Sequence, residues 1–182
     1  MAERFSKNKI ADIQNRDVFV DANVIIYWNW AIAGSKQLEI DYSSIYQELI
    51  KQKNKLFVDF LVISEVVNKM MRERHNAKIL LEQKSNKNFR LSYKQFRNSN
   101  EGQQILDNIY TILKTQIEDF NIVGKSFSED DIINFLNVDN LDFNDKGILQ
   151  MCQENNFVLL TNDEDYKNSD IDILTCNRQI LN

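Results

Sequence analysis

The sequence predicts an α/β domain in which a central parallel sheet of about four or five strands is covered on both faces by helices. Short apolar runs recur along the chain, and segments with helical spacing of apolar residues lie between them. The 182 residues include no proline and only four glycines. Because linkers are usually rich in these two residues, we expect one compact unit.

The predicted strands are short apolar runs that end in polar residues. We expect four of them at residues 17–20, 56–60, 157–161 and 171–175, and a weaker fifth at 121–123. Helical periodicity predicts helices at 42–53, 65–78 and, most clearly, 102–120. Ser128 with Asp131 three residues later resembles a capping box at the start of a further helix, and another helix is expected at 142–154.

The charged residues are divided along the chain. Residues 69–97 contain nine Lys or Arg against two Glu, whereas residues 118–172 contain fourteen Asp or Glu against three Lys. The N-terminal stretch carries charges throughout and lacks the apolar core of a secretion signal. No stretch approaches the about 20 apolar residues of a membrane-spanning helix. We therefore expect a cytoplasmic protein that does not bind membranes.

Four acidic residues lie at predicted strand ends or helix starts. Asp21 interrupts the apolar stretch VFVDANVIIY, Glu65 lies in LFVDFLVISEVVNKM, Asp145 lies in LDFNDKGILQMCQENN, and Asp163 lies in the TNDEDY segment after a strand. The carboxyl ends of parallel strands form one edge of a sheet, where ligands commonly bind. We expect the four acids to meet at that edge.

One acid at a helix start is most simply a cap, and this is our interpretation of Asp130 and Asp131. Four acids gathered from distant segments would repel one another unless a cation compensated them. Oxygen ligands suit hard cations such as Mg²⁺ or Mn²⁺. Such cations can activate water against a phosphodiester, so the pattern predicts metal-assisted hydrolysis.

The motifs VFVDANVIIY, ISEVVNK and NDKGILQMCQENNFVLLTNDEDY together resemble the PIN-domain ribonucleases, which include the VapC-type toxins of toxin–antitoxin pairs. The resemblance spans most of the chain in the right order. It implies a three-layer PIN-like fold and an Mg²⁺- or Mn²⁺-dependent endoribonuclease that cleaves single-stranded RNA. Asp21, Glu65, Asp145 and Asp163 fall on the family's four acidic positions and are the implied catalytic and metal-binding residues.

The resemblance also implies supporting roles and partners. Asn23 and Thr161 are expected to hold Asp21 and the acidic loop in place, and Asp165 to be a weaker metal ligand or a neighbour of one. From its spacing, Asp142 could share the helix face of Asp145, three residues later, but we interpret it as a cap or a solvated acid. An antitoxin protein and a homodimer are the implied protein partners. The chain is longer than a compact toxin, so we expect a single PIN-like domain over residues 1–182 with a helical insertion at about 76–119.

The basic segment combines Arg90, Lys94 and Arg97 with three aromatic residues, Phe89, Tyr93 and Phe96. These are the components of a groove that binds single-stranded nucleic acid. If the segment is helical, the cations form one stripe and the aromatics another. An ordinary amphipathic helix with its aromatics inward explains the same pattern slightly better, and in both cases the cations are available to RNA phosphates.

Two other functions fit parts of the pattern. A phosphatase of the haloacid dehalogenase type also has a strand that ends in Asp, but it needs a second acid two residues later, where this chain has Asn23. A PIN-like scaffold that binds RNA or protein without cutting is the main alternative, and metal-dependent cleavage separates it from the nuclease. His75 is the only histidine, and we expect a surface role for it.

Overall fold

The computed structural model describes residues 2–31 and 34–182. The chain divides into two compact units, one formed by Met1–Val62 with Phe120–Asn182 and the other by Ile63–Asp119. The predicted helical insertion at 76–119 falls inside the second unit. Each unit is described below by itself.

The first unit contains a six-stranded sheet in the order β1-β6-β5-β2-β3-β4. All the paired strands are parallel. The bounds of the strands are β1 Arg4–Ser6, β2 Val18–Val20, β3 Leu56–Val58, β4 Phe120–Ile122, β5 Val158–Leu160 and β6 Ile173–Thr175. The α/β class and the parallel sheet are confirmed, and five of the strands lie at the predicted places.

The predicted strand number of four or five was too low, because β1 was missed. The segment Arg4–Ser6 has a single apolar residue, Phe5, so no run marks it in the sequence. Its strand conformation depends on pairing with β6, in which Arg4 lies opposite Ile173. The Arg4 guanidinium also donates to the carbonyl oxygens of Ile171 at 2.6 Å and Ser169 at 2.5 Å.

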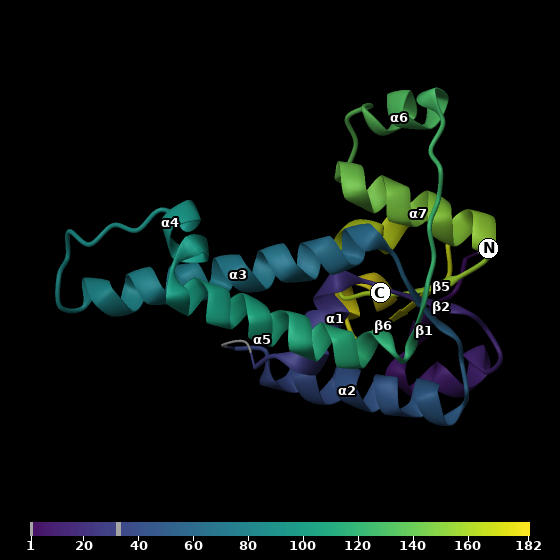
Figure 1. Ribbon diagram of the computed structural model, residues 1–182. Helices are drawn as coiled ribbons and strands as arrows, with labels where there is room; N and C mark the ends of the chain where they lie inside the picture. Colours follow the sequence, from purple (N-terminus) through teal and green to yellow (C-terminus); the bar gives the residue numbers. More distant parts are fainter. Residues whose placement is uncertain (1, 32–33) are drawn as a thin grey trace. The chain divides into compact units, whose positions relative to one another are not determined.

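Helices flank the sheet, giving the first unit three layers, with α7 on one side and α1 and α2 on the other (Figure 1). Helical elements wholly within this unit are η1 Lys7–Ile13, α1 Ala22–Asn29, α2 Lys36–Lys51, α6 Glu129–Phe135, α7 Phe143–Asn155, η2 Glu164–Asn168 and α8 Arg178–Leu181. Strands β2, β5 and β6 are buried along their whole length. Their apolar side chains on both faces are what the covering helices pack against.

The second unit is helical. It contains α3 Phe60–Gln83 from residue 63 onward, α4 Tyr93–Asn98 and α5 Asn100–Ile117. Figure 1 shows α3 and α5 side by side, with α4 at the N-terminal end of α5. An ion pair at 3.1 Å between Lys78 and Glu101 joins α3 to α5. The ring of His75 lies 5.4 Å from that of Phe96, between α3 and α4. His75 is therefore half-buried among aromatic rings rather than free on the surface.

Helix caps set several boundaries. Ser128 and Asp131 form the capping box that the sequence predicted for α6. Helix α3 begins before the predicted residue 65, because Asp59 accepts a 2.8 Å hydrogen bond from the Val62 amide and so caps the helix. Among residues 2–31 and 34–182, no helix has both the length and the apolar character needed to cross a membrane.

Candidate active site

Asp21 begins the site at the carboxyl end of β2. Its amide donates to the Leu160 carbonyl at 3.0 Å, and its Oδ1 accepts a 2.6 Å hydrogen bond from the Ala22 amide, so Asp21 is the N-cap of α1. The residue is only 5% exposed. A helix N-terminus stabilises a carboxylate, so α1 offsets part of the cost of burying this one.

Two side chains hold the second oxygen of Asp21. The Thr161 hydroxyl and the Asn23 amide each donate to Asp21 Oδ2 at 2.6 Å. The parallel register of β2 and β5 pairs Val20 with Leu160, so Asp21 and Thr161 follow neighbouring strands. Asn23 Oδ1 also accepts from the amide of Asn162 at 3.1 Å. The orientation of the Asp21 carboxylate is therefore fixed from both sides.

The acidic loop, residues 161–165, leaves β5 beside Asp21. The Asp163 amide donates to Thr161 Oγ1 at 3.0 Å, and Asp163 Oδ1 accepts from the Asp165 amide at 3.1 Å, so Asp163 caps η2. Asp163 is half-buried, whereas Asp165 is exposed. The Thr161 hydroxyl thus contacts both predicted acids: it donates to the Asp21 carboxylate and accepts from the backbone amide of Asp163.

A buried tyrosine and an asparagine support the acidic loop. The Tyr42 hydroxyl lies 3.0 Å from the carbonyl oxygen of Thr161 and 2.9 Å from Oδ1 of Asn162. Asn177, the N-cap of α8, donates its side-chain amide to the Asn162 carbonyl at 2.8 Å. The loop is therefore attached to α2 and α8 as well as to β2. Burial raises the pKa of Tyr42, so its hydroxyl keeps its proton and can donate.

Asp145 projects from the first turn of α7, where the Asp142 side chain caps the helix by accepting a 2.9 Å hydrogen bond from the Asp145 amide. The hydroxyl of Tyr166, which lies in η2, donates to Asp145 Oδ1 at 2.8 Å. Burial raises the pKa of Tyr166 above its ordinary value, and so do the charges of Asp21 and Asp145. The phenol therefore remains a donor to Asp145 across the physiological pH range.

The predicted acids of the first unit affect one another electrostatically. The pKa of Asp145 is raised to about 6, first by burial and then by the negative charges of Asp142, Asp21 and Asp163, while the hydrogen bond from Tyr166 opposes the rise. Asp21, Asp145 and Asp163 thus come from the end of β2, from α7 and from the acidic loop, and they lie close enough for their negative charges to interact.

Whether these residues could bind a metal ion depends on the chemistry of their ligand atoms and on their arrangement. Carboxylate, amide and hydroxyl oxygens are the ligands that Mg²⁺ and Mn²⁺ prefer. However, no three Asp, Glu, His or Cys side chains in the described part of the chain lie in an arrangement that could hold a metal ion. The oxygen atoms of these residues fit a hard cation by their chemistry.

Two further acids, Asp59 and Glu65, follow β3 in the chain. Glu65 is half-buried on α3 and belongs to the second unit, so its membership of the acidic set stays a prediction. Asp59 directly follows β3, is 4% exposed, and has a pKa raised by burial against the opposing effect of backbone amides. Its 2.8 Å hydrogen bond to the Val62 amide makes it the cap of α3.

Sequence reasoning overlooked Tyr166 and Asp59. Tyr166 ends the TNDEDY segment, but its sequence position alone does not show that its hydroxyl reaches Asp145. Asp59 ends the run LFVD in the same way that Asp21 ends VFVD, and this repeated pattern was a usable signal. Both runs place an acid at the carboxyl end of a parallel strand.

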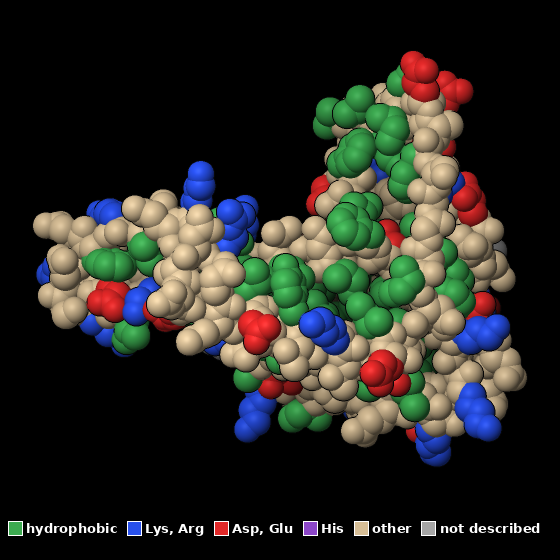
Figure 2. All heavy atoms as spheres, in the orientation of Figure 1, with side chains coloured by type: hydrophobic (Ala, Val, Ile, Leu, Met, Phe, Trp, Pro, Cys, Tyr) green, Lys and Arg blue, Asp and Glu red, His purple; other side chains and the backbone are tan. Residues whose placement is uncertain are grey.

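The predicted RNA-binding cations lie in the second unit. Arg90, Lys94 and Arg97 are exposed, but α4 begins at Tyr93, so Arg90 precedes the helix. The segment is therefore not helical throughout, and the condition for a single helical stripe of these cations is not met. Phe96 is buried, which agrees with the amphipathic interpretation. Figure 2 shows several Lys and Arg side chains over the end of this unit that carries α4.

A parallel α/β sheet with acids from separate segments at its carboxyl edge is typical of hydrolases that act on phosphate esters. The model of the PIN domain family matches residues 18–171, and the chain therefore belongs to the PIN domain family. PIN domains are typically nucleases, so the chain has a nuclease fold. No curated protein matches the chain.

Proposed function

We propose that this protein is a divalent-metal-dependent endoribonuclease that hydrolyses phosphodiester bonds of RNA. The observation that carries the proposal is the juxtaposition of Asp21, Asp145 and Asp163, whose charges interact enough to help raise the pKa of Asp145 to about 6. Such mutual repulsion destabilises the metal-free protein, so it is most simply explained by a cation that binds there during function.

The cation would be held by Asp21, Asp145 and Asp163, with Glu65 as the predicted fourth acid and Asp165 as a weaker candidate. When bound, Mg²⁺ or Mn²⁺ supplies charge neutralisation, polarises the phosphate and activates water. The protein's own part is orientation. Thr161 and Asn23 fix the direction of the Asp21 carboxylate, and their bonds to one of its oxygens leave lone pairs for other contacts.

Tyr166 has a comparable role toward Asp145. Its protonated phenol occupies one lone pair of Asp145 Oδ1 and leaves Oδ2 for a ligand. Because Tyr166 is fully buried, the phenol cannot swing into solvent, so the carboxylate is held on one side. A preorganised carboxylate of this kind lowers the reorganisation needed when substrate and cation bind.

RNA as the substrate is supported by the basic segment of the second unit. Among the residues that the structure describes, eight of the nine cations in residues 69–97 have no acidic partner, and Lys78 alone is paired, with Glu82 and Glu101. Unpaired cations bind phosphates without losing an existing ion pair. We propose that Arg90, Lys94 and Arg97 provide part of this affinity.

The decisive experiment compares the wild type with Asp21→Asn and with the control Asp12→Asn, which changes an exposed acid in η1. The wild type and the control should cleave single-stranded RNA when Mn²⁺ or Mg²⁺ is added, and Asp21→Asn should not. A cation at about a hundredfold excess over its Kd should stabilise the wild type by about 2.7 kcal/mol and Asp21→Asn by much less. Equal thermal shifts in all three proteins would contradict a metal site at Asp21.

The alternative is a PIN-like scaffold that binds RNA or protein without cleavage. RNA binding without metal-dependent cleavage would establish this alternative. A toxin role is a finer form of the nuclease proposal, and a small basic DNA-binding antitoxin encoded immediately upstream would support it. Light scattering would test the homodimer.

A further inference from the structure

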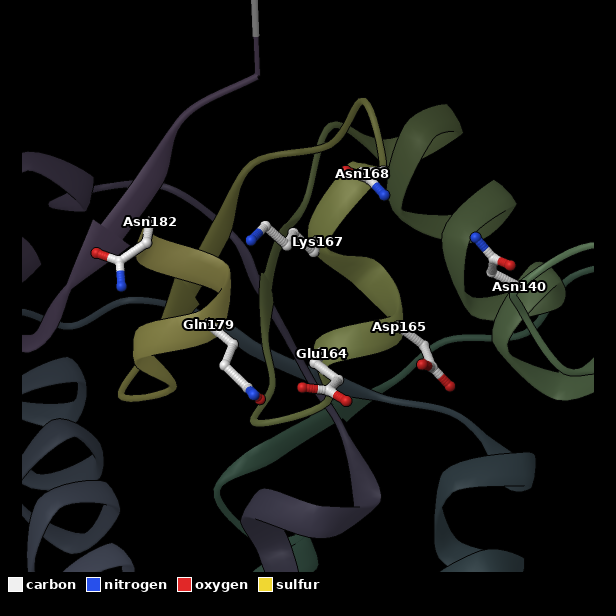
Figure 3. A pocket seen from close by; sticks show the side chains of 7 residues that line it. All are labelled: Asn140, Glu164, Asp165, Lys167, Asn168, Gln179 and Asn182. Atoms are coloured by element: carbon white, nitrogen blue, oxygen red, sulfur yellow. The ribbon is translucent and has the colours of Figure 1, made fainter.

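A polar groove of about 520 Å³ lies next to the acidic loop (Figure 3). Its walls are side chains of η2, of α8 with the residue that follows it, and of the loop before α7. We call it the η2–α8 groove. Its volume falls in the range of small-ligand sites and is sufficient for one nucleotide. Apart from Asp165, the weaker candidate for a metal ligand, the nuclease proposal uses none of the residues that line it.

Both main walls of the groove are built onto the acidic loop. Asp163 caps η2 by accepting from the Asp165 amide at 3.1 Å, so the first wall begins at the residue after Asp163. Asn177 caps α8 and donates to the Asn162 carbonyl at 2.8 Å, which attaches the second wall to the same loop. A strand of RNA that places a phosphate at Asp163 would therefore have a neighbouring nucleotide at the groove.

The groove is lined mainly by amide side chains. Asn140, Asn168, Gln179 and Asn182 contribute four of the seven lining residues, and none of the seven is aliphatic or aromatic. Each amide carries a donor and an acceptor, which is the combination that recognises the edge of a nucleobase. In single-stranded RNA these edges are free of base pairing and accessible to side chains.

The charges in the groove favour a base over a phosphate. Glu164 and Asp165 contribute two negative charges and Lys167 one positive charge, so the lining is acidic overall. A phosphate would be repelled, whereas a base with adjacent N–H groups would find acceptors. Guanine presents two such donors, N1–H and the N2 amino group, and a carboxylate can accept both at once.

Glu164 and Gln179 are placed for this recognition. Figure 3 shows the Glu164 carboxylate reaching from η2 and the Gln179 amide reaching from α8 toward the same part of the groove. Glu164 would accept from guanine N1–H and N2–H, and Gln179 or Lys167 would donate to O6. Adenine and uracil cannot satisfy a carboxylate in this way, because adenine has an acceptor at N1 and uracil has only one donor on that edge.

We propose that the η2–α8 groove binds a guanine base of single-stranded RNA next to the phosphate that meets the acids, with Glu164 as the residue that selects guanine. This inference rests on the proposed ribonuclease function for its substrate class. It extends that function from RNA in general to RNA with guanine beside the scissile bond.

The test measures binding of fluorescent RNA hexamers that differ at one central base, in EDTA so that cleavage does not interfere. The wild type should bind the guanine hexamer about tenfold more tightly than the adenine hexamer. Inosine, which lacks the N2 amino group, should bind with intermediate affinity. Glu164→Gln should lose the preference for guanine, and the matched control Glu3→Gln, an exposed residue before β1, should keep it.

Three results would overturn the groove proposal: equal affinity of the wild type for the guanine and adenine hexamers, preference for another base, or a guanine preference that survives in Glu164→Gln. Gln179→Ala is a second variant, which should reduce guanine affinity with little effect on adenine. Because binding is measured without metal, it is independent of the nuclease proposal. A protein that binds guanine selectively but does not cleave with Mn²⁺ would leave the groove proposal standing and contradict the nuclease.

Discussion

The Thr161 hydroxyl donates a 2.6 Å hydrogen bond to Asp21 Oδ2 across the carboxyl ends of two paired strands. Thr161 is completely buried, and the same oxygen accepts from the Asp163 amide at 3.0 Å. One side chain therefore joins the two acids on which the candidate active site depends. Since the hydroxyl faces a carboxylate in a buried setting, its loss has consequences for both stability and orientation.

Thr161→Val should destabilise the metal-free protein by about 2 kcal/mol, because a buried carboxylate loses a donor and the Asp163 amide loses an acceptor. Thr161→Ser keeps the hydroxyl and is the control, with a smaller loss that reflects the missing methyl group alone. Urea denaturation of the three proteins measures the difference. If valine proves as stable as serine, the hydrogen bond to Asp21 does not contribute as proposed.

Asp145 should make stability depend on pH in metal-free protein. Burial first, and then the charges of Asp142, Asp21 and Asp163, raise its pKa to about 6, so the folded state holds the Asp145 proton more tightly than the unfolded state does. This contribution to stability is present below the unfolded pKa of about 4 and is lost as pH rises through about 6. Asp145→Asn removes the titration and should be the more stable protein at neutral pH.

Urea denaturation in EDTA between about pH 4.5 and about pH 7.5 checks this expectation. The difference in unfolding free energy between wild type and Asp145→Asn should grow in favour of the variant as pH rises, while acids that do not interact with Asp145 cancel in the comparison. Parallel pH profiles would mean that Asp145 is not held in a buried acidic setting.

The sequence was sufficient for those parts of the fold that depend on local pattern. The runs VFV, LFV and VLL are apolar on both faces, so β2, β3 and β5 could be located, and with them the acids that follow. β1 could not be located, because the conformation of Arg4–Ser6 depends on pairing with a strand at the other end of the chain. Local composition contains no information on that pairing.

In the candidate site, too, contacts that follow from local sequence could be predicted, and contacts that depend on packing between elements could not. Asn23 and Thr161 were expected to lie beside Asp21, because Asn23 is two residues away in the chain and Thr161 follows the adjacent strand. Both donate to the Asp21 carboxylate. The contact from Tyr166 to Asp145 spans two elements and depends on how η2 packs against α7, which no spacing rule describes. The η2–α8 groove was missed for a similar reason, because it forms only when η2, α8 and the loop before α7 pack together.

Gly102 should be essential to the second unit. A Cβ at this position would lie 2.0 Å from the Phe96 carbonyl oxygen and 3.1 Å from the Arg97 Cα, and these backbone atoms cannot move aside cheaply. Gly102→Ala should therefore destabilise this unit by about 1 to 3 kcal/mol. Gly124→Ala is the matched control, since a Cβ there would meet no described atom within 4 Å.

Hydrogen exchange resolved along the chain measures the effect of Gly102→Ala. Amides of α4 and α5 should lose protection, and those of β2 and β5 should keep it. Unchanged protection in α4 and α5 would show that α5 can move away from α4 at little cost. A loss spread evenly over both units would show that they unfold together.

The exposed cations of the second unit should contribute to RNA affinity through phosphate contacts. Replacing Arg90, Lys94 and Arg97 with Glu should weaken the binding of unstructured RNA. The slope of log K against log salt concentration should become about 2 less steep, since each phosphate contact of a single strand contributes about 0.7 to it. The control reverses Lys9, Lys36 and Lys55, which are exposed in the first unit and give the same change in net charge. Binding measured in EDTA at several salt concentrations separates a local contact from a general charge effect. If both triple variants bind RNA with the same affinity and the same slope, the basic segment is only the solvated face of an amphipathic helix.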